Sequence, residues 1–321
     1  MTPSSAPVDM LALCDKYDLV DLFGRYVPTE APWLRFRRFD EVEDPASIRF
    51  ALGWMPRADR LRQFPNLQLV CSIGAGADGL LSLPTLTERT LISRLRDEEQ
   101  AAMMAGFAVW HVIWQQRGMA RYLRQQGDVV WDPFNREPPS RTRIGILGYG
   151  HMGKVIAKAL KPLGFPLSAL VRKATSDEDG VLGVDLYSGA KGLAAIAAEN
   201  DILINVLPLT EETRGLLDAS FFAAMKPGAY LINLGRGAQL VETDLLAALE
   251  SGQVSGAGLD VFQTEPLPAD SPLWRHPKVL VTPHVASEAD NAKIVRFAAA
   301  EIRRFLDGEP LQGLVDRSQG Y

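Results

Sequence analysis

The second half of the chain alternates short apolar runs with stretches in which apolar residues recur at helical spacing. Strands are predicted at RIGIL, PLSALV, DILINVL, AYLINLG, VSGAGLDV and PKVLVTPH. Helices are predicted between the first five of these runs, at residues 151–162, 190–199, 219–225 and 241–250. The runs are apolar at consecutive positions, as is typical of strands buried on both faces. This half is therefore predicted to form a parallel sheet with helices on both sides.

The first half shows a weaker form of the same alternation. Residues 66–73 (NLQLVCSI) predict a buried strand that ends in GAGAD, and residues 17–20 and 49–52 are weaker strand candidates. Residues 97–126 carry Met103, Phe107, Trp110 and Trp114 at helical spacing, which favours a core or subunit interface. The Pro-rich stretch 131–140 predicts a connection or an arm, and residues 288–307 predict one last helix.

Length and composition narrow the class of protein. A chain of 321 residues exceeds one ordinary core, so two α/β domains are expected. With 47% hydrophobic and 23% charged residues, the chain is neither disordered nor fibrous. Its net charge of −5 without a basic stripe argues against nucleic-acid binding.

Cysteine usage and hydropathy bear on compartment and metal binding. Cys14 and Cys71 are the only cysteines, too few for a disulfide framework or a cysteine-rich zinc site, so no metal is expected. No apolar run approaches the ~20 residues that a membrane helix needs, and no signal peptide is apparent. We therefore expect a cytoplasmic protein that has no membrane partner.

The sequence GYGHMG at 148–153 matches G-x-G-x-x-G between a predicted strand and a predicted helix. Gly148 permits the tight turn, Gly150 lets the backbone approach a pyrophosphate, and Gly153 allows close packing of helix on strand. The N–H groups at the helix start, around His151 and Met152, would bind the phosphates. The pattern predicts a dinucleotide cofactor, against the alternative of a plain glycine turn.

The end of the next strand indicates which dinucleotide is bound. NAD-binding proteins place an Asp or Glu there for the ribose 2′-hydroxyl, whereas this strand ends with Arg172 and Lys173. Two cations would bind a 2′-phosphate. We therefore expect NADP(H), with NAD as the alternative cofactor and two solvated surface cations as the alternative interpretation.

Three residues of complementary chemistry each follow the carboxyl end of a predicted strand, which lines the ligand crevice of an open α/β sheet. Arg236 suits bidentate capture of a carboxylate. His284 can protonate a carbonyl oxygen as a hydride arrives, and Glu265 can orient its ring and favour the charged form. The pattern predicts hydride transfer to a 2-oxo acid. His111, His151 and His276 are more simply explained as structural.

Long motifs also resemble a known family. GILGYGHMG, NVLPLTEETRGLLD, LINLGRGAQLVETDLLAALESGQVSGAGLDVF, EPLP and SPLWRHPKVLVTPHVAS resemble the D-isomer-specific 2-hydroxyacid dehydrogenases. Within that family, SPLWRHP and the terminal VDRSQGY are most similar to the group A glyoxylate/hydroxypyruvate reductases. The resemblance implies NADPH-dependent reduction of glyoxylate and hydroxypyruvate. It also implies two Rossmann-like domains with the active site in the cleft between them, and a homodimer formed through helices and an arm resembling residues 97–140.

The resemblance implies a domain for each segment and roles for matched residues. Residues 1–108 and 288–321 would form a flavodoxin-like substrate-binding domain, and residues 109–287 the dinucleotide-binding domain. Arg236 would bind substrate, and Glu265 with His284 would form the acid–base pair. Further implied contacts are Asp260, beside the nicotinamide amide; Leu207 and Pro208, on the cofactor; Ala75 and Gly76, as backbone donors to the substrate carboxylate; and Trp54, near the substrate.

Two other functions fit the same sequence features. A dinucleotide-sensing binding protein or corepressor on this fold can keep the three residues, although no long disordered tail for recruiting partners is visible. A phosphoglycerate-type dehydrogenase often carries an appended regulatory domain, and this chain ends soon after its last predicted helix. Consumption of NADPH in the presence of glyoxylate separates the enzyme from the binding protein.

Overall fold

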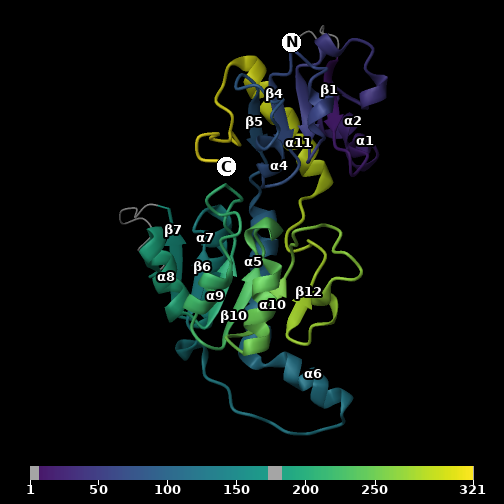
Figure 1. Ribbon diagram of the computed structural model, residues 1–321. Helices are drawn as coiled ribbons and strands as arrows, with labels where there is room; N and C mark the ends of the chain where they lie inside the picture. Colours follow the sequence, from purple (N-terminus) through teal and green to yellow (C-terminus); the bar gives the residue numbers. More distant parts are fainter. Residues whose placement is uncertain (1–6, 173–182, 321) are drawn as a thin grey trace. The chain divides into compact units, whose positions relative to one another are not determined.

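The computed structural model describes residues 7–172 and 183–320, and the chain divides into two compact units. The first, which we call the split unit, combines Met1–Glu98 with Glu288–Tyr321. The second, which we call the continuous unit, comprises Glu99–Ser287. Each unit contains one parallel sheet with helices on its faces (Figure 1), as the sequence predicted.

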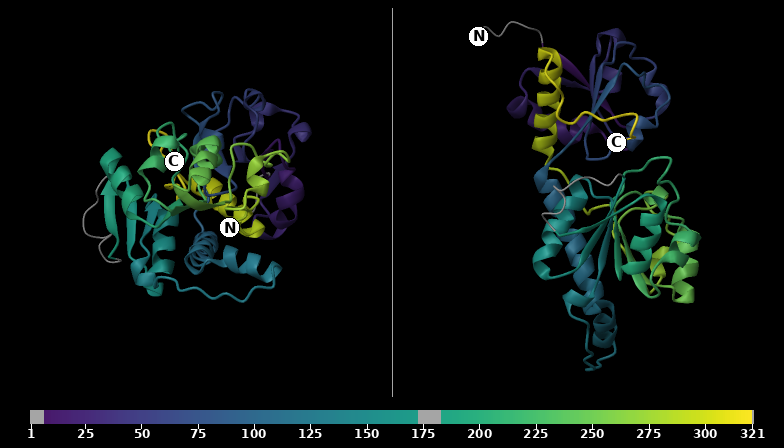
Figure 2. Two further views of the ribbon diagram at one scale, coloured as in Figure 1. Left: turned by 60° about the horizontal axis from the view of Figure 1, so that its bottom comes forward. Right: turned by 90° about the vertical axis from the view of Figure 1, so that its left-hand side faces the viewer.

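The split unit has a five-stranded sheet in the order β2-β1-β3-β4-β5 within the described residues. The strands are β1 (Val8–Leu13), β2 (Leu34–Arg37), β3 (Phe50–Gly53), β4 (Leu69–Ser72) and β5 (Leu91–Arg94). One face packs against α1 (Leu19–Phe23), α2 (Val27–Glu30) and α11 (Asn291–Asp307), and the other against α3 (Ala58–Leu61) and α4 (Asp78–Leu81). Helix α11 comes from the far end of the chain and completes this unit (Figure 2, yellow). The strand order is that of flavodoxin-like sheets.

The prediction of a strand at residues 17–20 is wrong, because this stretch leads into helix α1. Asp18 instead caps α1, and its Oδ1 accepts hydrogen bonds from the N–H groups of Val20 at 2.9 Å and Asp21 at 3.1 Å. A side-chain acceptor at this position starts a helix, so Leu19 is buried as a helical residue. The apolar residues that suggested a strand are the buried side of a short helix.

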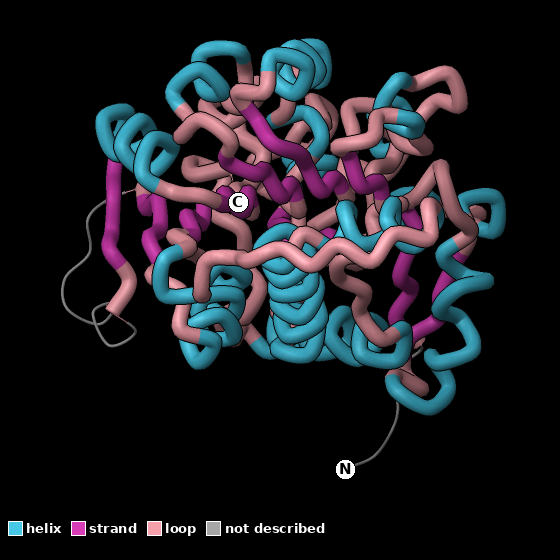
Figure 3. Tube along the Cα trace, turned by 90° about the horizontal axis from the view of Figure 1, so that it is seen from below, coloured by secondary structure: helices cyan, strands magenta, loops and turns pink. Residues whose placement is uncertain are grey.

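The continuous unit has a seven-stranded sheet, within the part of the chain that the structure describes, in the order β12-β11-β10-β9-β6-β7-β8. The strands are β6 (Ile144–Leu147), β7 (Leu167–Val171), β8 (Asp185–Ser188), β9 (Ile202–Asn205), β10 (Ala229–Asn233), β11 (Val254–Leu259) and β12 (Val279–Val281). One face packs against α5 (Glu98–Arg117) and α7 (His151–Leu160), and the other against α8 (Gly189–Glu199), α9 (Ala219–Ala224) and α10 (Glu242–Ser251). Figure 3 shows helices on both sides of these strands.

Two features of this sheet position the candidate site. The strand order reverses at β6, which pairs with β7 on one side and β9 on the other. Loops that follow the strands at such a point form the usual ligand crevice of an open α/β sheet. Strands β10, β11 and β12 are neighbours, so the residues that follow them share one edge of the sheet.

Helix α5 stops at a glycine and is followed by α6 (Met119–Gly127) and an extended segment. Gly118 has φ +67°, and a Cβ there would lie 2.6 Å from the Phe134 ring. A left-handed residue breaks the helix at low cost only when it is glycine. The helix predicted over 97–126 is therefore two helices.

Candidate active site

The turn that carries Arg236 follows β10 and packs tightly on the segment after β11. Arg236 is half-buried, and its Nη1 donates to the Gly235 carbonyl at 2.8 Å. A Cβ on Gly237 would lie 1.8 Å from the carbonyl carbon of Phe262. Only glycine fits there, so the Arg236 turn is seated directly on the backbone that leads to Glu265.

Glu265 and His284 form the central contact of the site. His284 Nδ1 lies 2.8 Å from Glu265 Oε2, and Glu265 Oε1 accepts the Phe262 N–H at 3.1 Å. One carboxylate oxygen is therefore fixed by backbone while the other orients the imidazole. The His284 side chain is 37% exposed, so the ring keeps access to solvent and ligand. His284 also has φ +57°, an uncommon conformation for a residue with a side chain.

Asp260 holds the loop that bears His284. It is buried, with Oδ1 accepting from Thr282 Oγ1 at 2.6 Å and from the Val285 N–H at 3.0 Å. Its Oδ2 accepts the Ala286 N–H at 2.9 Å. These bonds fix the backbone on both sides of His284, and sequence reasoning did not foresee them because the donors lie more than twenty residues along the chain.

The glycine loop has the geometry that its pattern predicted. Gly148 has φ +103°, and a Cβ there would lie 3.1 Å from the Leu207 nitrogen. A Cβ on Gly153 would lie 2.0 Å from the Gly148 carbonyl oxygen, so the start of α7 packs against the turn. A Cβ on Gly150 would meet no described atom within 4 Å, which leaves open space over the loop. His151 is exposed at the start of α7 and Met152 is half-buried beside it.

Other predicted cofactor residues of this unit lie at neighbouring strand ends. Leu207 and Pro208 are half-buried in the loop after β9, next to Gly148. Arg172 is exposed at the end of β7. Lys173 lies outside the described residues.

The split unit carries the three remaining predicted residues around the loop after β4. A Cβ on Gly74 would lie 3.3 Å from the Trp54 ring, so Trp54 packs on the loop that contains Ala75 and Gly76. Successive carbonyls of this loop are bound: that of Gly74 by the Leu95 N–H at 3.2 Å, that of Ala75 by Arg94 Nη1 at 3.1 Å, and that of Gly76 by Ser72 Oγ at 2.8 Å.

The N–H groups of this loop are engaged only at its start, where the Gly74 N–H donates to Ser72 Oγ at 3.3 Å. Among the described residues, the amides of Ala75 and Gly76 donate no hydrogen bond. Ser72 and Arg94, which sequence reasoning missed, therefore hold the loop with its carbonyls occupied and its amides available. Adjacent free N–H groups of this kind form an anion-binding concavity.

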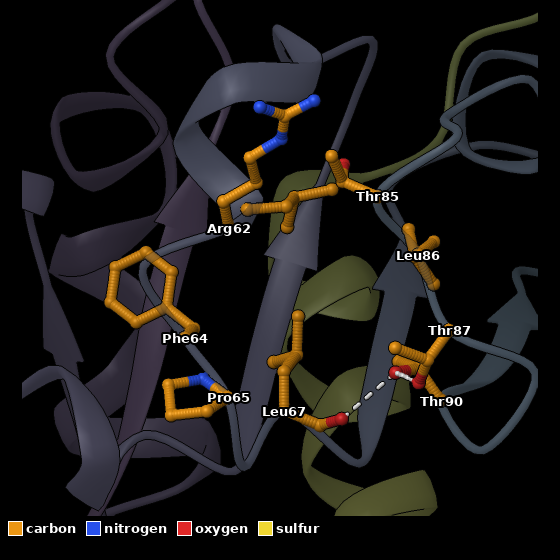
Figure 4. A pocket seen from close by; sticks show the side chains of 9 residues that line it. Arg62, Phe64, Pro65, Leu67, Thr85, Leu86, Thr87 and Thr90 are labelled. Atoms are coloured by element: carbon orange, nitrogen blue, oxygen red, sulfur yellow. Dashed lines mark hydrogen bonds between the residues drawn. The ribbon is translucent and has the colours of Figure 1, made fainter.

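A hollow in the split unit lies at the amino ends of its strands, opposite to the end that carries Ala75 and Gly76. It is lined by Leu61, Arg62, Phe64, Pro65, Leu67, Thr85, Leu86, Thr87 and Thr90 (Figure 4). Leu67 and Thr90 precede β4 and β5, and Thr90 Oγ1 donates to the Leu67 carbonyl at 2.9 Å. This hydroxyl already has its partner, and the hollow lies at the amino ends of the strands, unlike Ala75 and Gly76.

Within residues 7–172 and 183–320, no group of three or more His, Cys, Asp or Glu side chains could hold a metal ion. Over the same ranges, no helix combines the length and apolar character required to cross a membrane.

Comparison with known proteins identifies close relatives. The model of the D-isomer specific 2-hydroxyacid dehydrogenase NAD binding domain matches residues 109–286. Glyoxylate/hydroxypyruvate reductase A of Salmonella heidelberg (strain SL476) is 36% identical over 295 residues, which cover 90% of this chain and 93% of the relative.

Solved structures agree with this match over nearly the whole chain. A D-isomer specific 2-hydroxyacid dehydrogenase from Xanthobacter autotrophicus Py2, in complex with NADPH and MES, is 35% identical with a TM-score of 0.89, covering 97% of this chain and 99% of the other. An NADPH-dependent glyoxylate/hydroxypyruvate reductase from Sinorhizobium meliloti, in complex with NADP and sulfate, is 30% identical with a TM-score of 0.89, covering 98% and 99%.

Proposed function

The chain belongs to the D-isomer-specific 2-hydroxyacid dehydrogenase family, and from that premise we propose that it is an NADPH-dependent reductase of glyoxylate and hydroxypyruvate. The observation that carries the proposal is the 2.8 Å contact between His284 Nδ1 and Glu265 Oε2, at the sheet edge that also bears Arg236. The names of the Salmonella and Sinorhizobium relatives support these two substrates.

In the proposed mechanism, Arg236 binds the carboxylate of the 2-oxo acid. Its guanidinium is charged at all relevant pH values and presents a planar pair of donors. The seating of Gly237 on Phe262 fixes the direction from which this fork approaches. The free N–H groups of Ala75 and Gly76 are proposed as further donors to the substrate carboxylate, and Trp54 as the aromatic contact near the substrate.

His284 acts as the proposed proton donor. NADPH, when bound, supplies the hydride that adds to the carbonyl carbon. The carbonyl oxygen then gains negative charge, and His284 Nε2 delivers a proton to it, so that the product is the 2-hydroxy acid. Glu265 accepts from Nδ1–H, which fixes the orientation of the ring and leaves Nε2 for the substrate oxygen.

The continuous unit is proposed to bind the dinucleotide and the split unit to contribute to substrate binding. The open space at Gly150 and the tight turn at Gly148 fit a pyrophosphate at the start of α7. Arg172, at the end of β7, is proposed to bind the 2′-phosphate and to favour NADPH over NADH. NADP and NADPH in the neighbouring structures support this preference.

The direct test is an assay of the purified protein with either cofactor and a panel of 2-oxo acids. We expect NADPH to be consumed with glyoxylate and hydroxypyruvate, with one 2-hydroxy acid formed per NADPH oxidised, and a weaker rate with NADH. An Arg172→Asp variant should lose much of the preference for NADPH. Absence of NADPH consumption with every 2-oxo acid would reject the reductase in favour of a dinucleotide-sensing protein.

We also propose that the protein is a homodimer and cytoplasmic. Val129 and Trp131, in the segment after α6, are 92% and 96% exposed, and large exposed apolar residues mark interaction surfaces. Light scattering should show a dimer that Trp131→Ser weakens and that the control Leu163→Ser, at another exposed apolar position, leaves intact. Cys14 and Cys71 are both free thiols, in keeping with a reducing compartment.

A further inference from the structure

Three buried amide side chains lie beneath the two loops that follow β9 and β10. Asn205 and Asn233 are the last residues of these neighbouring strands, and Gln239 ends the short helical turn after Arg236. Asn205 and Asn233 are fully buried, and Gln239 is 1% exposed. Polar groups so far from water need partners within the protein, so their hydrogen bonds determine the local structure.

Gln239 uses its complete bonding capacity. Its Oε1 accepts the Arg236 N–H at 2.9 Å and Asn205 Nδ2 at 2.8 Å. Its Nε2 donates to the carbonyls of Leu207 at 3.1 Å and Pro208 at 3.0 Å. An amide has two donor hydrogens and an oxygen with two lone pairs, and all are engaged here. The side chain thus joins the Arg236 turn to the Leu207–Pro208 loop.

The two asparagines extend the same connection. Asn205 Nδ2 also donates to Asn233 Oδ1 at 2.9 Å, and Asn205 Oδ1 accepts the Leu207 N–H at 3.3 Å. Asn233 Oδ1 accepts the Gly235 N–H at 3.3 Å. A Cβ on Gly235 would lie 2.5 Å from Gln239 Oε1, so the chain before Arg236 rests directly on the amides. Neither loop can shift without breaking bonds to the other.

We propose that Gln239 is a positioning residue that sets the substrate-binding Arg236 turn and the cofactor-binding Leu207–Pro208 loop in one fixed relation. The inference rests on the proposed function, which assigns substrate to the first loop and NADPH to the second. Gln239 itself is buried, so its proposed action is through these two loops. Its removal therefore weakens binding of both, through separate hydrogen bonds of one side chain.

The test compares Gln239→Met with Leu240→Met, a matched control at the next buried position, where the side chain is apolar. Both substitutions nearly conserve volume, but only the first removes hydrogen bonds. We expect Gln239→Met to raise the Kd for NADPH, measured by protein fluorescence, and the KM for glyoxylate, each by about five- to tenfold. Leu240→Met should change each by less than about twofold. A Gln239→Met protein in which either constant stays near wild type overturns the inference.

Gln239→Glu tests the two connections of Gln239 separately. It also replaces Gln239→Met in the test if thermal unfolding shows that Gln239→Met does not fold. A glutamate keeps an oxygen for the Arg236 N–H but turns a second oxygen toward the carbonyls of Leu207 and Pro208. We expect weaker NADPH binding with a nearly unchanged KM for glyoxylate, and equal changes in both would overturn the inference. The NADPH measurement needs no turnover. A wild type that binds NADPH but reduces no 2-oxo acid would therefore defeat the proposed function alone, and the Kd values would still test the connection between Gln239 and the Leu207–Pro208 loop.

Discussion

Two loops at the carboxyl ends of strands present chemical groups in opposite ways. In the loop after β4, the carbonyls of Gly74, Ala75 and Gly76 are all bound, while the amides of Ala75 and Gly76 donate no hydrogen bond within the described chain. In the loop after β12, Asp260 binds the amides of Val285 and Ala286, and the loop presents a side chain, His284. The first loop therefore leaves two backbone N–H groups available, whereas the second has its backbone N–H groups bound and presents a side chain.

The difference shows how each kind of site is supported. A backbone site needs acceptors to be occupied, so Ser72 and Arg94 supply donors. A side-chain site needs amides to be occupied, so Asp260 supplies acceptors. Because buried polar groups need partners, the supporting residue has the opposite hydrogen-bonding character to the backbone groups that it occupies, which leaves the other groups of the loop available. Variants of both kinds of residue test this comparison.

The largest expected effect is that of His284→Gln. Glutamine fills similar space but cannot deliver a proton, so kcat for glyoxylate reduction should fall by about 10²–10⁴-fold. NADPH binding should persist. His276→Gln, whose Nδ1 merely accepts the Lys278 N–H at 3.2 Å, is the control and should remain active. Near-normal turnover of His284→Gln would remove the histidine from the mechanism.

Arg236→Lys tests the second side chain that this edge presents. An ammonium cannot reproduce the paired donors of the guanidinium. We expect kcat/KM for glyoxylate to fall by the equivalent of about 1.5–3 kcal/mol, as steady-state kinetics will measure. An unchanged kcat/KM would show that Arg236 does not hold the carboxylate.

Asp260→Asn tests the support of the His284 loop. In the wild type both carboxylate oxygens of Asp260 accept backbone N–H groups. In the variant the side-chain NH₂ replaces one oxygen and faces a backbone N–H, so the free energy of unfolding should fall by about 1–3 kcal/mol. Turnover should fall with it, because His284 loses its fixed backbone. Asp244→Asn is the control in urea unfolding, because the half-buried Asp244 accepts a single backbone N–H within the described residues, that of Ala219 at 2.8 Å. Full activity of Asp260→Asn would show that the loop keeps its conformation without this support.

His111 makes the stability of the fold sensitive to acid. It is fully buried against Gly258, and burial lowers the pKa of its imidazole to about 4, although the nearby Asp260 acts in the opposite direction. The folded pKa lies below the unfolded value of 6.5. The stability that the neutral His111 contributes is therefore fully present above about pH 6.5 and is lost as pH falls toward 4.

At about pH 5 this loss should reach about 2 kcal/mol. In His111→Gln, urea unfolding should show a smaller drop in stability between about pH 7 and pH 5 than in wild type. The same drop in both proteins would mean that other groups cause the acid sensitivity. His276→Gln, a half-buried histidine, should behave like wild type.

Ser72→Ala should have the smallest effect. It removes the 2.8 Å bond to the Gly76 carbonyl and the longer 3.3 Å bond that the hydroxyl accepts from the Gly74 N–H. A bond of this kind contributes about 0.5–1.5 kcal/mol. We expect the KM for glyoxylate to rise by the equivalent factor, about two- to tenfold, while kcat stays close to wild type. Ser82→Ala, whose hydroxyl bonds the Gly79 carbonyl in α4 at 3.4 Å, should leave KM unchanged.

The sequence predicted the elements whose residues are uniformly apolar. In the continuous unit, β6, β7, β9, β10, β11 and β12 all fall within predicted runs. Strand β8 was missed because it lies at the sheet edge and its residues DLYS are polar and partly exposed. Strands β1, β2 and β5 were also missed, and α1 was mistaken for a strand because four or five residues are too few to separate the two periods.

The candidate site divides in the same way. Gly148, Arg236, Glu265 and His284 could be found because each stands at a recognisable place after a strand, and the structure brings the last two into contact. Ser72, Arg94 and Gln239 were not found, because their partners are backbone atoms of loops that only the fold brings close. A polar residue at the very end of a buried strand, such as Ser72 or Asn205, was the one signal available.

The backbone contact at Gly237 has a consequence for protein engineering. With Phe262 only 1.8 Å from the position of any added Cβ, this site tolerates no side chain without displacing the segment that leads to Glu265. In a randomised library of the 234–239 turn, sequencing of the folded clones should return glycine at 237 almost without exception.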